Sequence, residues 1–152
     1  MSTKYPTLAS PLDLNGVTLR NRLGHASILT KFVRDGEATA ELINYLGARA
    51  RGGAGLIVTE PIAMTAHNRV PYRLRAWDDG ALDSLQRLAA AVEAADSRLL
   101  GQVQDSGRGR HAVGRNDGAV GASALPDDLS WTVPRVLTTA GIRRMIDDWA
   151  GA

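Results

Sequence analysis

The sequence predicts an α/β protein built from parallel β/α units, with too few strands to close a barrel. The stretch 48–60 has the pattern of a helix end, a glycine turn and a buried strand. Its apolar run Leu56-Ile57-Val58 has no alternating polar residue, which is typical of parallel sheets covered on both faces. Strand-then-helix patterns occur three times in succession over about 22–152, which favours a right-handed parallel arrangement.

Chain length limits how much of such a fold can form. An eight-stranded β/α barrel needs about 250 residues, and this chain has 152. The chain therefore forms either a small open sheet or the N-terminal part of something larger, and the second interpretation is favoured.

Composition excludes several classes of function. A formal net charge of +2 is too small to predict a nucleic-acid or membrane partner. The chain has no cysteine, which excludes disulfides, thiolate metal sites and cysteine nucleophiles. The sequence shows neither an apolar signal core nor a stretch of transmembrane length, so we expect a cytoplasmic protein.

The N-terminal elements begin with a hairpin over about 12–19, because Asn15-Gly16 stands between alternating apolar residues. A first strand is expected over 22–28. A turn is expected at Asp35-Gly36, and Thr39 is the predicted N-cap of a helix that runs to about Arg51.

The middle of the chain carries a second strand over 55–60 and a helix over about 79–95. The apolar face of that helix is predicted to contain Leu82, Leu85, Ala89 and Val92, widened by Leu88.

The C-terminal third begins with a third strand over 99–104, followed by a glycine- and arginine-rich segment over 106–121. A long connection of this kind is typical of a functional or disordered loop. Thr138 or Thr139 is predicted to cap a last helix with an apolar face. That face would contain Ile142, Met145, Ile146 and Trp149.

Several segments together resemble the N-terminal part of the Old Yellow Enzyme family of NAD(P)H:flavin oxidoreductases. The resemblance extends from about Leu8 to Ala152, and it rests on the order and spacing of the segments rather than on any one of them. The segments are Ser10-Pro11-Leu12, Leu19-Arg20-Asn21-Arg22-Leu23, Ala48 to Glu60, Gly101-Gln102-Val103, Ser106-Gly107-Arg108, Ala122-Ser123 and Pro134-Arg135.

The resemblance implies that residues 1–152 are the N-terminal part of a (β/α)₈ TIM-barrel domain that holds FMN at the carboxyl ends of its strands. It also implies an ene-reductase type of reaction, in which NAD(P)H reduces FMN and FMN reduces an electron-poor alkene. The substrate would be a small enone or enoyl-type molecule.

Particular residues acquire expected roles through this resemblance. Ala26, Ser27, Ile28 and Leu29 would line the flavin ring through backbone groups, and Pro61 would lie beside it at the end of the second strand. Gln102 would hydrogen-bond the pyrimidine edge, a role that suits an amide because it both donates and accepts.

The sequence also departs from the family pattern. Ser27 stands where proline is frequent, and Leu29 replaces a threonine or cysteine that can tune the flavin by hydrogen bonding, although the adjacent Thr30 retains a hydroxyl. Asp105 replaces a histidine, and Lys31 stands near the position of an active-site tyrosine in some relatives.

The substrate-anchoring His-x-x-His or His-x-x-Asn pair of the family lies on the next strand, beyond Ala152. No catalytic residue is therefore predicted within the chain, and we expect the chain alone neither to hold FMN tightly nor to turn over. The alternative is a non-enzymatic remnant, or a subunit that completes its barrel with a partner chain or as a homo-oligomer.

Simpler readings compete with the functional ones. Glu60 could be a site residue or a solvated strand end, and His25 fits a structural histidine better than a catalytic one. Arg108-Gly109-Arg110 with Arg115 resembles an RNA-contacting patch, but no aromatic residue is interleaved for base stacking. The three histidines lack metal-ligand spacing, so no metal site is expected.

Overall fold

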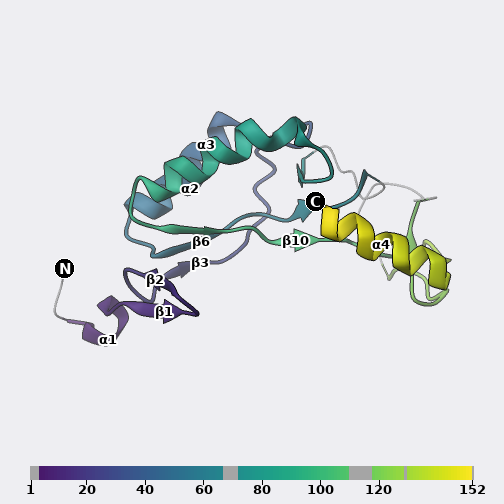
Figure 1. Ribbon diagram of the computed structural model, residues 1–152, viewed down its shortest axis with the longest axis horizontal. Coiled ribbons are helices and arrows are strands. Elements are labelled where there is room, and N and C mark those ends of the chain that lie inside the picture. The colour runs from purple at the N-terminus through teal and green to yellow at the C-terminus, as the bar shows by residue number, and fades with distance from the viewer. Residues whose placement is uncertain (1–3, 67–71, 110–117, 129, 152) are drawn as a thin grey trace.

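The computed structural model describes residues 4–66, 72–109, 118–128 and 130–151 (Figure 1). Its central sheet has three parallel strands in the order β3-β6-β9. The bounds are Gly24–His25 for β3, Leu56–Val58 for β6 and Arg98–Leu100 for β9. The order follows the chain, so each strand is a neighbour of the next, as predicted for successive β/α units.

The second and third strands continue beyond this sheet. β7 (Ile62–Ala63) pairs in parallel with β10 (Val103–Gln104) on one side and with β8 (Leu74–Arg75) on the other. The Thr59 N–H donates to the Leu100 carbonyl at 2.9 Å, and the Ile62 N–H donates to the Gln102 carbonyl at 2.8 Å. The segments 56–63 and 98–104 therefore run side by side along their whole length.

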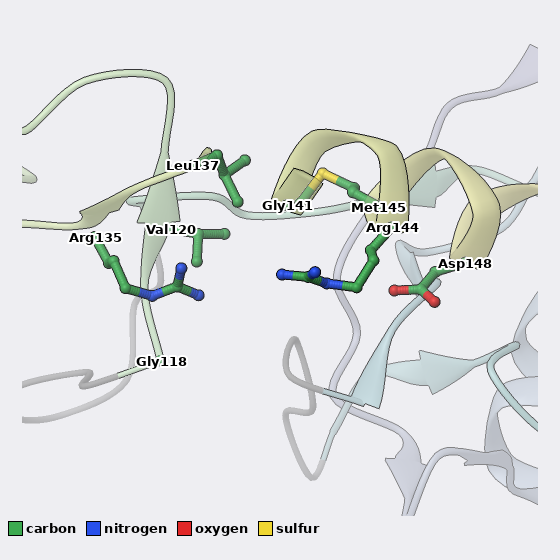
Figure 2. Close-up of a pocket in the computed structure, with 8 residues that line it drawn as sticks. All are labelled: Gly118, Val120, Arg135, Leu137, Gly141, Arg144, Met145 and Asp148. Carbon is green, nitrogen blue, oxygen red and sulfur yellow. The ribbon is translucent and has the colours of Figure 1, made fainter. Parts of the chain in front are cut away.

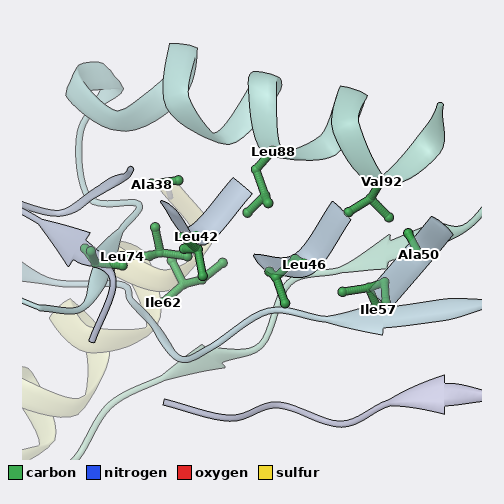
Figure 3. Close-up of a cluster of buried hydrophobic side chains, with 10 residues drawn as sticks. Ala38, Leu42, Leu46, Ala50, Ile57, Ile62, Leu74, Leu88 and Val92 are labelled. Carbon is green, nitrogen blue, oxygen red and sulfur yellow. The ribbon is translucent and has the colours of Figure 1, made fainter. Parts of the chain in front are cut away.

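Two helices, α2 (Ala40–Arg51) and α3 (Leu82–Glu93), cover one face of the sheet (Figure 1). Their apolar side chains meet Ile57 of β6 in a cluster of buried residues (Figure 3). The cluster contains Val33, Ala38, Leu42, Leu46, Ala50, Ile57, Ile62, Leu74, Leu88 and Val92. Burial of this apolar surface is the main force that holds the layer together.

The ends of α2 follow the sequence signals. Thr39 precedes the helix, and its hydroxyl accepts from the Leu42 N–H at 3.3 Å, as an N-cap does. Gly53 adopts φ of 112° after the helix, a conformation that favours glycine. Both predictions for this helix are confirmed.

The N-terminal segment contains α1 (Pro6–Ala9) and the predicted hairpin of β1 (Leu12–Leu14) and β2 (Val17–Leu19). Asn15 and Gly16 have φ of 50° and 88°, as the tight turn requires. The turn at Asp35-Gly36 joins a second hairpin of β4 (Val33–Arg34) and β5 (Glu37–Ala38), whose strands were not predicted. β3 is shorter than the expected strand 22–28.

The predicted helix 79–95 is a 3₁₀ turn, η2 (Asp79–Ala81), followed by α3. Its predicted apolar face is wrong for Leu82, which is 49% exposed. The buried position is taken by Ser84, whose hydroxyl accepts from the Ala38 N–H at 3.0 Å and donates to the Ala81 carbonyl at 2.9 Å. A satisfied hydroxyl costs little to bury, so the helix turns Ser84 inward and Leu82 outward.

The C-terminal part lies beyond the carboxyl ends of the strands (Figure 1). β11 (Val120–Gly121) pairs in parallel with β12 (Arg135–Val136), and α4 (Thr139–Gly151) follows. The Thr138 hydroxyl accepts from the Gly141 N–H at 3.1 Å, so the predicted cap is Thr138. Within the described ranges no helix is long and apolar enough to cross a membrane.

Candidate functional site

Glu60 is the central residue at the carboxyl ends of the strands. Its side chain is 1% exposed, so the reading of a solvated strand end is wrong. One carboxylate oxygen, Oε2, accepts from the Thr30 N–H at 3.0 Å and from the Thr30 hydroxyl at 2.6 Å. The Thr30 hydroxyl oxygen in turn accepts from the Phe32 N–H at 3.1 Å. Glu60 thereby ties the segment after β3 to the end of β6.

A guanidinium lies close to this carboxylate. Arg73 donates to the Ser106 hydroxyl at 2.7 Å, which connects the segment before β8 with the segment after β10. Burial lowers the pKa of Arg73, and interactions with Tyr72, Asp105 and Glu60 oppose that shift. Among the described residues, Glu60 Oε1 and Arg73 Nε are buried without a hydrogen-bond partner. Both atoms keep the capacity to form one more hydrogen bond.

The four residues expected to line a flavin follow β3 directly. Ala26, Ile28 and Leu29 are exposed and Ser27 is half-buried, so this segment is largely open to solvent. Lys31 comes next with φ of 63°, and its ammonium lies 5.5 Å from the centroid of the Tyr72 ring, within reach of a cation–π interaction.

Pro61 and Gln102 lie at the ends of the two neighbouring strands. Gln102 donates its backbone N–H to the Thr59 hydroxyl at 3.0 Å. Its half-buried side-chain amide has no hydrogen bond to any residue that the structure describes. Pro61 lacks a backbone N–H and offers only its carbonyl and ring. The sheet therefore brings all six predicted cofactor residues to one edge.

Four polar residues support this edge, and of these only Thr30 was singled out from the sequence, as the hydroxyl beside Leu29. Thr30, Thr59, Arg73 and Ser106 support the strand ends through the hydrogen bonds described above. The sequence pointed to the Thr30 hydroxyl but not to its hydrogen bond with Glu60. The others depend on contacts between distant segments, which a local pattern does not contain.

The other candidate residues from the sequence are the histidines and the arginines of the segment 106–121. The His25 ring packs edge-on against Tyr45 at 6.1 Å between centroids, and its Nδ1 is buried without a hydrogen bond among the described residues. Arg108 donates to the Pro126 carbonyl at 2.6 Å. Arg110, His111 and Arg115 lie outside the described residues, as does His67. No group of three or more potential metal-ligating side chains occurs within the described ranges.

Comparison with known proteins identifies the family. The family model described as NADH:flavin oxidoreductase / NADH oxidase matches residues 7–152. The chain belongs to this family. The resemblance to Old Yellow Enzymes is thereby confirmed.

Curated relatives of the NADH:flavin oxidoreductase family are considerably longer than this chain. A metal reductase of Desulforamulus reducens is 32% identical over 95% of the chain and 22% of its own length. An NADH oxidase of Thermoanaerobacter brockii is 31% identical over 99% of the chain and 24% of its own length. The chain thus spans about a quarter of these relatives.

Solved structures agree on the fold. Morphinone reductase superposes with a TM-score of 0.80 at 25% identity, over 97% of this chain and 44% of its own. A 2-naphthoyl-CoA reductase complex superposes with a TM-score of 0.84 at 23% identity, over 95% of this chain and 24% of its own. The described strands form no closed barrel, so the predicted fold class, a partial (β/α)₈ barrel, is confirmed.

Proposed function

We propose that the edge formed by the ends of β3, β6 and β9 is part of the FMN site of an NAD(P)H-dependent oxidoreductase of the ene-reductase type. The observation that carries this proposal is the convergence of residues 26–29, Pro61 and Gln102 at one sheet edge. In parallel α/β folds ligands gather at that edge. Family membership supplies the flavin chemistry.

The residues present fit the ring of a flavin in part. The Gln102 amide has no hydrogen-bond partner among the described residues, so it can donate to a carbonyl oxygen and accept from a ring N–H of the pyrimidine edge. The exposed backbone of Ala26 to Leu29 would lie along the ring. Pro61 would contribute its carbonyl and ring, and Leu29 offers no side-chain hydrogen bond.

When bound, FMN supplies hydride transfer, from NAD(P)H to an electron-poor alkene such as a small enone or enoyl compound. The chain's own residues would orient the ring. Glu60 would fix the position of segment 26–32 through Thr30. Polarising the substrate carbonyl requires converging donors, and we assign that role to no described residue. We therefore propose weak FMN binding and no turnover for the 152-residue chain by itself, in a cytoplasmic setting.

A fluorescence-quenching titration with FMN tests this assignment. We expect saturable binding by the chain with a Kd weaker than about 10 µM, because only part of the ring is enclosed. Gln102→Leu should weaken that binding by about tenfold, the value of one or two hydrogen bonds. Gln86→Leu is the matched control, because Gln86 is an exposed amide on α3. It should bind as the parent chain does.

Two results would contradict the proposal. Equal affinity for the Gln102 and Gln86 variants would remove Gln102 from the site. Stoichiometric FMN in the purified chain, with NADPH-driven reduction of an enone, would contradict the proposed lack of turnover.

A second candidate function is a non-enzymatic chain that completes its barrel with a partner. It is favoured by β9, which is an edge strand of the described sheet, and by Leu100 and Val103, which are exposed there. An open edge with apolar neighbours is a surface for strand pairing. Size-exclusion chromatography decides the point, because a monomer with a cooperative melt would count against this candidate.

A further inference from the structure

We propose that the hollow between β11–β12 and α4 binds a small organic oxyanion, a carboxylate or phosphate monoester carried on an apolar body. This site is separate from the proposed FMN site at the carboxyl ends of β3, β6 and β9, and the proposal does not depend on that site. The hollow has a volume of about 240 Å³, below the roughly 300–1,000 Å³ of pockets for drug-sized ligands, so it suits only a small ligand such as one ring with one charged group. Its lining includes Val120, Arg135, Leu137, Arg144, Met145 and Asp148.

Two guanidiniums converge on this hollow from different elements. Arg135 extends from β12 and Arg144 from α4, and their charged groups point into the space between the two elements (Figure 2). Neither side chain has a hydrogen bond or ion pair with any residue in the described ranges. Planar guanidiniums match the geometry of carboxylate and phosphate oxygens, so an oxyanion between them would satisfy both.

The rest of the wall selects an apolar body. Val120 is buried, and Leu137 and Met145 are half-buried on the side of the hollow above the guanidiniums (Figure 2). A ring placed there would cover apolar surface that otherwise faces water. Asp148 stands at the far end, where its charge would repel a second anionic group on the ligand. The expected ligand therefore has its charge at one end only.

Ligand binding would also connect α4 to the rest of the fold. The one buried residue of α4 within the described positions is Gly141, so the helix has little of its own packing. An anion held by Arg135 and Arg144 would join β12 to α4, and a ligand that binds only this arrangement raises its stability.

Isothermal titration calorimetry on the full 152-residue chain tests the site, with phenyl phosphate, benzoate and inorganic phosphate as probes. We expect saturable, salt-sensitive binding of phenyl phosphate or benzoate, and the tighter of the two identifies the preferred head group. Inorganic phosphate should bind at least about fivefold more weakly, because it lacks the apolar body.

Matched arginine variants distinguish binding by specific side chains in the hollow from general attraction of anions to a positively charged surface. Arg135→Gln and Arg144→Gln should each weaken binding by about tenfold or more. Arg143→Gln is the control, because Arg143 is exposed on the same helix and is not among the lining residues; it should change the affinity less than twofold. All three residues are exposed, and circular dichroism checks that each variant keeps its helices.

Three outcomes would overturn the proposal. They are the absence of saturable binding for both organic anions, an equal loss of affinity in the Arg143 variant, and inorganic phosphate binding as tightly as phenyl phosphate.

Discussion

Two regions of the molecule use similar apolar patterns and reach different degrees of burial. In the layer of α2 and α3, Leu42 and Leu88 have no exposed surface, whereas Ile142 and Ile146 of α4 are 47% and 62% exposed. All four belong to apolar stripes with helical spacing. The apolar stripe thus predicts a helix and which of its faces turns inward. Burial of that face also requires other residues to pack against it. The described residues pack closely against α2 and α3 and only sparsely against α4.

The largest expected effect follows from truncating one side chain in each region. Leu46→Ala should lower the free energy of unfolding by about 2–5 kcal/mol, because it opens a cavity in the closed layer. Ile146→Ala should change it by less than about 0.5 kcal/mol. Urea unfolding followed by far-ultraviolet circular dichroism measures both. Equal losses would mean that α4 is packed as firmly as α2, and the comparison would fail.

The second prediction concerns the stability of the proposed FMN site at the carboxyl ends of β3, β6 and β9, compared with the layer of α2 and α3. Thr30→Val removes the hydroxyl that donates to Glu60 while the carboxylate stays buried. This should cost about 1–3 kcal/mol of stability. Thr18→Val, at an exposed position of strand β2, is the control and should stay within about 0.5 kcal/mol. If both variants unfold at the same urea concentration, Glu60 does not anchor the segment after β3.

The smallest effects concern the two helix caps, which have the same chemistry in both regions. Thr39→Ala removes the cap of α2 and a hydrogen bond from the Thr39 hydroxyl to the Phe32 carbonyl, and should cost about 1–2 kcal/mol globally. Thr138→Ala removes the corresponding cap of α4.

We expect the Thr138 variant to speed amide hydrogen exchange in the first turn of α4 while leaving global unfolding nearly unchanged. A fall in global stability equal to that of the Thr39 variant would show that α4 folds as one unit with α2 and α3.

Local chemistry explains which elements the sequence could predict. The Asn15-Gly16 turn, the Thr39 cap and the apolar run of β6 each depend on neighbouring residues, and each is found in the structure. The parallel order also follows from local information, because successive β/α units place successive strands side by side.

What the sequence could not predict depends on contacts between distant segments. The pairing of β11 with β12 joins residues 15 positions apart, and the described residues between these strands contain no helix. The inward turn of Ser84 depends on a donor from Ala38, and the burial of Glu60 depends on Thr30. Polar residues can be buried when a remote partner satisfies them, and a pattern of apolar residues does not reveal such partners.

Amide chemical-shift mapping during an FMN titration of the ¹⁵N-labelled chain tests the central claim most directly. The account predicts saturable shifts confined to residues 26–29, to residues near Glu60 and to Gln102, with α3 and α4 unaffected. Absence of saturable shifts at the strand ends, or shifts centred on another surface, would contradict the assignment of this edge to the flavin.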